Sequence, residues 1–413
     1  LCAFSVCIFS VNFVVSAVHG KFKSWKFVNL SSNILKQLSF SMPKSLFIIA
    51  MLMCFLQCSF SNEQQLKPIG ETGKSFRVIG FYKGDGLDIE QYDLSKLTHL
   101  IFCFAYLDGN KISIKNEADV AILKQFVALK NKYPNLKVLI SFGGWGGCET
   151  CSDVFSTETG RKEFVMSVKE MLEIYQADGI DLDWESPVIG GYKNHKASSA
   201  DKDNFTALLK ELRKELPTER EISFDANSFD AFLQLSIDWK AVMPLVDYVN
   251  LMTYGLPANQ NGFTGHHTAL YSSPNQVESA DRAINALDSM GVPMDKIIIG
   301  AAFYSFVAEQ VDSMNNGLNR PGKFKANINY NKLVTDYTEN QGYNYYWDTL
   351  AMAPYLYNKQ LQQFVTFDDK KSVTLKTQYA INHKLGGIMF WKLNGDTYTN
   401  GLLSAIDSTL HKQ

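Results

Sequence analysis

Hydrophobic residues in this chain gather into short continuous runs, each followed by Gly, Asn or Ser. Strands that are covered on both faces have continuous hydrophobic sequences, whereas half-exposed strands alternate. Eight runs are therefore expected to be buried strands: 77–82, 100–105, 137–142, 179–184, 221–225, 248–253, 296–300 and 387–391.

Between these runs, hydrophobic residues recur at spacings of three and four, which is the period of an amphipathic helix. Helices are expected over residues 120–129, 164–175, 204–216 and 277–290. Strands that alternate with helices form parallel sheets, and eight such units close into a barrel. The pattern predicts an α/β fold, a (β/α)8 TIM barrel.

The interval between Gly300 and Gly387 is much longer than the others and contains its own short hydrophobic runs. We expect a small α+β insertion over residues 301–370, between strands seven and eight. A helix near 373–383 should follow it. The insertion should form a wall of a cleft at the C-terminal face of the barrel.

The N-terminal residues differ from the rest of the chain. A positive residue, a hydrophobic stretch over 46–56 and the sequence Ser59-Phe60-Ser61 predict a secretory signal peptide over residues 42–61. Residues 1–41 are then upstream sequence or an atypical leader, and residues 62–413 form the barrel. A membrane anchor over residues 1–18 and a lipid anchor at Cys58 are the alternatives. The favoured interpretation is a secreted protein, extracellular or periplasmic, without a membrane span in the mature chain.

Charge and cysteine content narrow the possible partners. The chain has 40 basic and 42 acidic residues, and cleavage after Ser61 removes five Lys and no acid, which leaves a net charge of −7. That charge does not suit nucleic acid or anionic membranes. Cys148 and Cys151 lack a second ligand pair for zinc, so they form either a local disulfide or a reduced structural pair. No metal or cofactor is expected, and Cys103 lies inside a predicted strand.

The segment Asp178-Gly-Ile-Asp181-Leu-Asp183-Trp-Glu185 holds the densest candidate chemistry. Residues two apart on a strand share a face, so Asp181, Asp183 and Glu185 should point into the barrel, with Glu185 at its C-terminal mouth. Carboxyls about 6.6 Å apart in a sheltered site cannot all ionise, so at least one proton stays bound near neutral pH. Such a carboxyl suits general-acid catalysis.

Two other interpretations of these acids are weaker. A calcium or magnesium loop would place Gly and Asn between the acids rather than Ile, Leu and Trp. A structural ladder of acids would need neighbouring cations, and no Lys or Arg lies between Asp178 and Glu185.

This acidic segment resembles the signature of glycoside hydrolase family 18, the chitinases and their relatives. Further segments are similar to the family's strand and insertion motifs, and the resemblance covers roughly residues 76–410. These segments are Gly80-Phe-Tyr82, Ser141-Phe-Gly-Gly-Trp145, Met252-Thr-Tyr254, Tyr346-Trp-Asp348, Pro354-Tyr-Leu-Tyr357 and Gly387-Ile-Met-Phe-Trp391.

The resemblance implies substrate-assisted catalysis, in which the acetamido oxygen of the sugar is the nucleophile. Glu185 would protonate the glycosidic oxygen, Asp183 would orient the acetamido group, and Asp181 would share a proton with Asp183. The remaining implied roles belong to residues that hold Asp181 (Tyr82, Ser141), donate to the acetamido carbonyl (Tyr254) or bind sugar (Trp145, Trp391, Phe104, Met252).

The sequence departs from the family in two places. Gly255 follows Tyr254 where the family usually has Asp, and Phe303-Tyr-Ser-Phe306 lacks the Arg that often ends this motif. His266 and His267 are expected to be solvated histidines of a loop.

The expected function is a monomeric, secreted chitinase that cleaves β-1,4 linkages between N-acetylglucosamine units with retention of configuration. Two alternatives stay open. One is an endo-β-N-acetylglucosaminidase acting on N-glycans, which commonly lacks an insertion like 301–370. The other is a sugar-binding protein with little activity, although such proteins typically lose the acid that Glu185 provides here.

Overall fold

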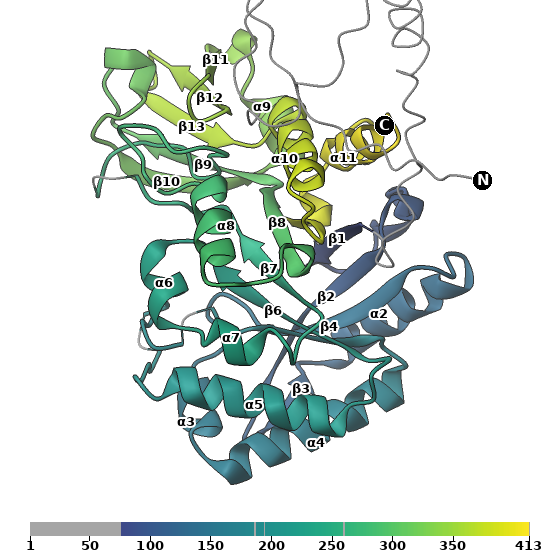
Figure 1. Cartoon of the computed structure of the whole chain (residues 1–413). Helices are drawn as coiled ribbons and strands as arrows, with labels where there is room; N and C mark the ends of the chain where they lie inside the picture. The colour runs from purple at the N-terminus through teal and green to yellow at the C-terminus, as the bar shows by residue number, and fades with distance from the viewer. Residues whose placement is uncertain (1–75, 186, 194, 259–260, 413) are drawn as a thin grey trace, which may run out of the picture. The chain divides into compact units, whose positions relative to one another are not determined.

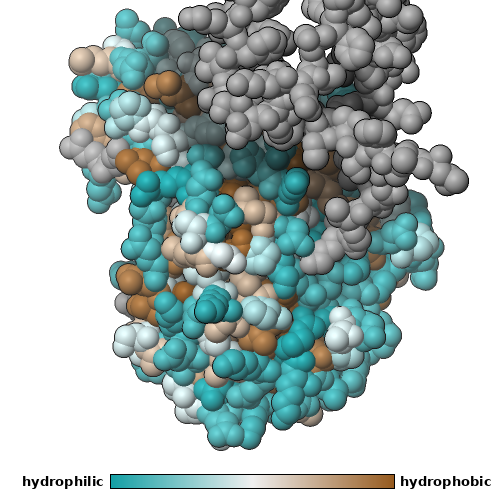
Figure 2. Space-filling view, in the orientation of Figure 1, coloured by the Kyte–Doolittle hydropathy of each residue, from teal (hydrophilic) through white to brown (hydrophobic). Residues whose placement is uncertain are grey.

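The computed structural model describes residues 76–185, 187–193, 195–258 and 261–412. The segments 1–41 and 42–61, for which a leader and a signal peptide are predicted, lie outside this range. Within it, no helix has the length and hydrophobicity needed to cross a bilayer. On the coloured surface in Figure 2, hydrophobic residues are scattered among hydrophilic ones.

Eight parallel strands form a closed barrel (Figure 1). Strand β1 pairs with both β14 and β2, which closes the ring, so the predicted (β/α)8 fold is confirmed. The barrel strands are β1 (Arg77–Tyr82), β2 (His99–Asp108), β4 (Lys137–Gly143), β5 (Gly179–Asp183), β6 (Glu221–Asn227), β7 (Tyr248–Met252), β8 (Ile297–Ala302) and β14 (Gly387–Trp391). An additional strand, β3 (Lys111–Ile114), extends β2 as an antiparallel hairpin.

Helices cover the outside of the barrel, and their first turns have favourable caps. Asn116, Thr157 and Ser279 each accept a backbone N–H from the third residue of the helix that follows, which satisfies a donor that the helix itself cannot. The helices are α2 (Glu117–Ala128), α3 (Cys151–Phe155), α4 (Glu158–Tyr175), α5 (Asp201–Glu215), α6 (Asp230–Leu235), α7 (Trp239–Val242), α8 (Ala280–Ser289), α10 (Lys370–Asn382) and α11 (Leu402–Leu410).

The alternation of side chains along each strand separates two hydrophobic layers. The larger layer lies between strands and helices, where Ile180 and Leu182 of β5 are fully buried. The smaller layer fills the inside of the barrel and includes Ile79, Ile101 and Met389.

The chain between β8 and β14 contains a second, antiparallel sheet with the order β10-β9-β13-β12-β11 (Figure 1). It packs around its own small hydrophobic cluster, which includes Val311, Tyr355 and Phe364. The elements are β9 (Tyr304–Glu309), β10 (Lys323–Asn329), α9 (Tyr330–Asp336), β11 (Asn344–Asp348), β12 (Ala353–Asn358) and β13 (Gln363–Phe367).

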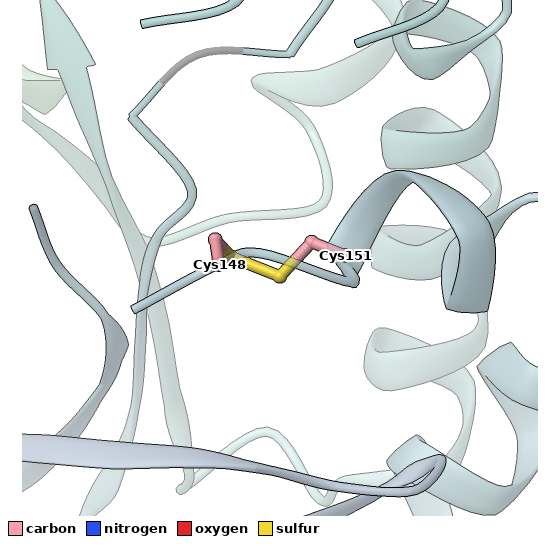
Figure 3. The surroundings of a disulfide bond; sticks show 2 residues. All are labelled: Cys148 and Cys151. Carbon is pink, nitrogen blue, oxygen red and sulfur yellow. A yellow bond between two sulfur atoms is a disulfide. The ribbon is translucent and has the colours of Figure 1, made fainter. Parts of the chain in front are cut away.

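Cys148 and Cys151 form a disulfide with an S–S distance of 2.09 Å. Figure 3 shows that this bond joins the loop before α3 to the first residue of the helix. Of the two alternatives for this pair, the structure therefore has the disulfide. Cys103 is free and buried, as expected.

A fully buried ion pair connects the end of the insertion to the barrel. Nζ of Lys376 in α10 lies 2.7 Å from Oδ2 of Asp368, and both side chains have no exposed surface. The same oxygen accepts hydrogen bonds from the Ala302 amide of β8 (2.9 Å) and the Thr268 hydroxyl (2.8 Å). The carboxylate is thus completely coordinated by groups from three segments, as a buried charge requires.

Replacing Lys376 with Met should destabilise the fold by about 3–5 kcal/mol, because it leaves the Asp368 carboxylate buried without its cation. Urea unfolding of the variant measures this loss. The matched control is Lys124→Met on the exposed face of α2, which should change the free energy of unfolding by less than about 0.5 kcal/mol. Equal stability of the two variants would contradict the assignment.

Candidate active site

The inner face of β5 carries the predicted acids. Asp181 is fully buried and Asp183 is 5% exposed, while Glu185 follows the strand at the C-terminal mouth and is half-buried. Trp184 points to the opposite side and packs in the outer hydrophobic layer. The alternation expected from the sequence is therefore present.

Asp181 is fully buried and accepts hydrogen bonds from three other strands, β4, β6 and β7. The Ser141 hydroxyl donates to Oδ2 (2.9 Å), whereas the Ser223 hydroxyl (2.6 Å) and the Asn250 amide (3.1 Å) donate to Oδ1. The predicted contact between Ser141 and Asp181 is present. Burial raises the pKa of Asp181, and these hydrogen bonds act against that rise by stabilising the charged form.

Asp183 lies above Asp181 in a different environment. Its Oδ1 atom is buried and has no hydrogen-bond partner among the described residues. Burial, and then the charges of Glu185 and Asp181, raise its pKa well above the ordinary range, while the Lys83 ammonium acts weakly in the opposite direction. These surroundings favour the neutral form of Asp183 over its charged form.

Glu185 is the outermost acid of the three. Burial raises its pKa to about 7, and the positive charge of Lys83 opposes this rise. Its backbone carbonyl accepts a hydrogen bond from the Asn227 amide (2.6 Å), which fixes the chain at this point. Glu185 is one of the residues that line a small pocket, together with Trp145 and Tyr192. A carboxyl with this pKa at a pocket can deliver a proton near neutral pH.

Aromatic rings form apolar surfaces beside the acids. Trp391, at the end of β14, stacks on Phe104 with ring centroids 5.6 Å apart and an interplanar angle of 17°. A bulge in β2 at Cys103 to Ala105 accompanies the inward position of Phe104. Trp145 is 64% exposed and contacts Tyr192 edge to face. Such flat surfaces suit the apolar faces of sugar rings.

Tyr254 and Met252 lie at the end of β7 and pack against the inner cluster of the barrel. The Tyr254 hydroxyl lies 3.7 Å from the Met389 sulfur. Burial raises the pKa of Tyr254 well above its ordinary value, and nearby carboxyls, Asp225 first and then Asp183 and Glu185, raise it further. The hydroxyl therefore stays protonated and can act as a hydrogen-bond donor in the part of the site that holds Asp183 and Glu185.

The prediction that Tyr82 holds Asp181 is wrong. The Tyr82 hydroxyl donates to Oδ1 of Asp88 (2.5 Å), and its ring packs on Phe126 of α2, outside the barrel. Adjacent residues on a strand face opposite sides, so the preceding residue, Phe81, points inward.

The prediction that His266 and His267 are solvated is also wrong, since they are 2% and 1% exposed. The insertion covers them: Nε2 of His266 lies 3.1 Å from Asp348, and the His267 ring stacks on Phe306. Burial lowers the pKa of His267 to about 3, so it stays neutral.

Three polar residues of the site were missed by the sequence analysis: Ser223 and Asp225 on β6, and Asn250 on β7. Asp225 is 3% exposed, and burial, followed by the charges of Asp181 and Asp183, raises its pKa well above the ordinary range. The signal was available, because polar residues occupy every second position of β6 from Glu221 to Asn227. This is the pattern of a strand with a polar inner face.

Gly255, where the family usually has Asp, adopts a φ of +68° and has open space around the position of a Cβ. It lines a cavity of about 580 Å³ with Phe306 and Phe324 of the insertion sheet. The residue that departs from the family pattern thus borders open space. Within the described part of the chain, no cluster of three or more His, Cys, Asp or Glu is arranged to hold a metal ion.

Comparison with known proteins agrees with this geometry. Chitinase A1 of Niallia circulans is 27% identical, over 88% of this chain and 62% of the relative, so this chain spans less than two thirds of that protein. Chitotriosidase-1 of Mus musculus is 28% identical, over 74% and 68%. The structure of a glycoside hydrolase family 18 N-acetylglucosaminidase from Paenibacillus barengoltzii superposes with a TM-score of 0.74 at 32% identity, over 81% of this chain and 100% of that one.

The family described as glycosyl hydrolases family 18 matches residues 77–396, which hold all eight barrel strands and the insertion. With an inward ladder of acids on β5 of a closed barrel, the chain belongs to glycosyl hydrolase family 18.

Proposed function

We propose that this glycoside hydrolase cleaves β-1,4 linkages between N-acetylglucosamine units of chitin, with Glu185 as the general acid. The observation that carries the proposal is the position of Glu185, a carboxyl with a pKa of about 7 at the mouth of a ladder of buried acids. The chitinases among the relatives support chitin as the substrate class.

The arrangement fits a substrate-assisted reaction. Glu185 gives its proton to the glycosidic oxygen while the acetamido oxygen of the sugar that carries the anomeric carbon attacks that carbon. The bond between the anomeric carbon and the glycosidic oxygen breaks, the leaving sugar departs with the proton as a hydroxyl, and a cyclic oxazolinium ion forms. Asp183 accepts the acetamido N–H and stabilises the positive charge, and the Tyr254 hydroxyl donates to the acetamido oxygen. The Glu185 carboxylate then takes a proton from water, which attacks the same carbon and gives net retention.

The apolar surfaces would position the chain of sugars around these groups. Trp391, backed by Phe104, provides a floor for the reacting sugar, and Met252 completes the inner wall. Trp145, exposed at the mouth, provides a platform for the leaving side. Holding the sugar in this way lowers the entropic cost of bringing its acetamido group into line.

A second candidate is an N-acetylglucosaminidase that releases single sugars, because the superposed Paenibacillus barengoltzii structure carries that description. Digestion of a chitin hexamer separates the two possibilities. Mainly dimers and longer products would favour the chitinase, whereas monomers alone from the earliest times would favour the N-acetylglucosaminidase.

We also propose secretion as a monomer. The disulfide between Cys148 and Cys151 supports an oxidising compartment, where such bonds persist. The predicted signal peptide over 42–61 is consistent with this location.

Glu185→Gln should lower kcat/KM for chitin oligosaccharides by about 10³-fold, because the amide cannot deliver a proton. Affinity for the oligosaccharide, measured by calorimetry, should stay within about threefold since the side-chain shape is kept. Glu219→Gln at an exposed position is the control and should have unchanged activity. Full activity of Glu185→Gln, or cleavage of completely deacetylated oligomers by the wild type, would refute the mechanism.

The alkaline limb of the kcat/KM profile should lie near pH 7, because activity needs Glu185 protonated and its pKa is about 7. Lys83 favours the charged form of Glu185, so Lys83→Gln should raise that pKa and move the limb to higher pH, by about 0.5 pH unit at low salt. Lys124→Gln serves as the control and should leave the limb in place. A limb that moves to lower pH in Lys83→Gln would oppose the assignment.

A further inference from the structure

A cavity of about 580 Å³ lies between the loop that follows β7 and the insertion sheet. On the barrel side it begins at Gly255, the residue directly after Tyr254. On the other side it is lined by Phe306 and Ala308 of β9. Its volume is within the range of small-molecule sites, about 300–1,000 Å³. The cavity is therefore large enough for a group attached to a substrate that is held at Tyr254.

One face of the insertion sheet presents apolar side chains to this cavity. Phe306 and Ala308 are two residues apart on β9, so their side chains share this face. Phe324 of β10 and Phe364 of β13 both pair in register with Ala308, one on each side, and both line the cavity. The Phe324 side chain is 66% exposed. A ligand in the cavity would therefore remove apolar surface of this ring from water.

A row of aromatic rings connects the cavity with the reacting groups. The Tyr304 ring contacts the Tyr254 ring edge to face, with centroids 5.9 Å apart, and lies 5.7 Å from the Phe306 ring. Phe306 in turn lies 6.0 Å from Phe324. Burial raises the pKa of Tyr304, and the charge of Glu185 adds to this rise. The row thus leads from the surroundings of Glu185, which protonates the leaving oxygen, into the cavity.

The described residues that line the cavity are uncharged. None of them is Asp, Glu, Lys or Arg. His267, the titratable residue among them, is 1% exposed, and burial lowers its pKa to about 3, so it stays neutral. The two departures from the family motifs, Gly255 and Phe306, both lie in this lining, where they replace an Asp and an Arg. Without these charges the cavity suits an apolar group, because no ion has to lose its water when the group binds.

We propose that this cavity binds an apolar aglycone, such as an alkyl chain, on the leaving side of an N-acetylglucosamine glycoside. The inference rests on the proposed function and narrows its substrate class. Glu185 gives its proton to the glycosidic oxygen, the bond from this oxygen to the anomeric carbon breaks, and the aglycone leaves as an alcohol. Contact of the aglycone with Phe306 and Phe324 stabilises the complex in proportion to the apolar area removed from water.

The octyl and methyl β-glycosides of N,N′-diacetylchitobiose test the inference, with release of the alcohol as the measurement and concentrations below micelle formation. The two alcohols are similar leaving groups, so the ratio of the two kcat/KM values reports how well the chain binds. The octyl glycoside should have a kcat/KM at least about tenfold higher, mainly through a lower KM, because its additional methylene groups are buried.

Two substitutions place a charge in the cavity from opposite walls. Phe324→Glu on the insertion sheet and Gly255→Asp after β7 should each lower the octyl-to-methyl ratio by about fivefold or more, because a carboxylate loses water where the chain binds. Asp is among the residues that tolerate the positive φ of Gly255. Leu350→Glu is the matched control and should keep the ratio, because Leu350 is a 61% exposed residue of the insertion outside this lining. Thermal unfolding establishes that the three variants fold.

Three outcomes would overturn the inference. The wild type could cleave the two glycosides equally well. Phe324→Glu and Gly255→Asp could both keep the wild-type ratio, which would place the chain elsewhere. The two variants could also lower kcat/KM for a chitin hexamer as much as for the octyl glycoside, which would make the cavity a site for further sugars. If Gly255→Asp does not fold, Phe324→Glu alone decides, since its side chain is exposed.

Binding of octyl β-D-glucoside, which has no acetamido group, separates this inference from the proposed function. Calorimetry should detect binding to the wild type that is weakened by about fivefold or more in Phe324→Glu and unchanged in Leu350→Glu. If the wild type shows this binding but cleaves neither the chitobiosides nor the hexamer, the proposed function fails and the apolar site stands. Cleavage of the hexamer together with an octyl-to-methyl ratio near one would keep the proposed function and refute the apolar site.

Discussion

Carboxyl groups crowded inside a dry barrel cannot all carry charge, and the chemistry of this site depends on how they divide the protons among them. The environment of each acid determines how strongly it holds a proton. Asp181 has three donors that stabilise its charge. Burial and the neighbouring charges of Glu185 and Asp181 raise the pKa of Asp183 well above its ordinary value. Glu185, nearest to the mouth, has a pKa of about 7 and can both give and take a proton near neutral pH.

The barrel fold holds the acids in the positions on which this distribution of protons depends. Closing eight parallel strands places the inner residues of β4, β5 and β6 in register, so Ser141, Asp181 and Ser223 meet at one level of the barrel. Asn250 of β7 pairs with Asp225 and reaches Asp181 from the next level. The outer residues of the same strands bind the helices through hydrophobic contacts. The ring of helices excludes water from behind the acids, which strengthens every electrostatic interaction in front of them. The buried pair of Lys376 and Asp368 connects the end of the insertion to the helix that follows it, α10.

Much of the fold could be predicted from the sequence, because the positions of the strands and the directions of their side chains depend on local periodicity. All eight barrel strands were placed to within a few residues, and the inward direction of Asp181 and Asp183 follows from alternation alone. Errors arose where a residue's environment depends on distant segments, or on which of two adjacent strand residues points inward. The motif resemblance assigns Tyr82 to the inside of the barrel, beside Asp181, but the alternation of side chains along β1 places Phe81 inside. The sequence around His266 and His267 predicts solvated side chains, because it does not show that the insertion covers them. Asp225 was missed because its importance appears only when β6 lies beside β5.

The most direct test of the account is a carbon-13 NMR titration of the side-chain carboxyls of Glu residues, with Glu185→Gln used to assign the Glu185 signal. The account predicts that one Glu signal titrates near pH 7 in the wild type and is missing from the variant. Titration of Glu185 near its ordinary pKa, about 4.3, would contradict it, because crowding and burial would then not keep the proton in place for transfer to the glycosidic oxygen.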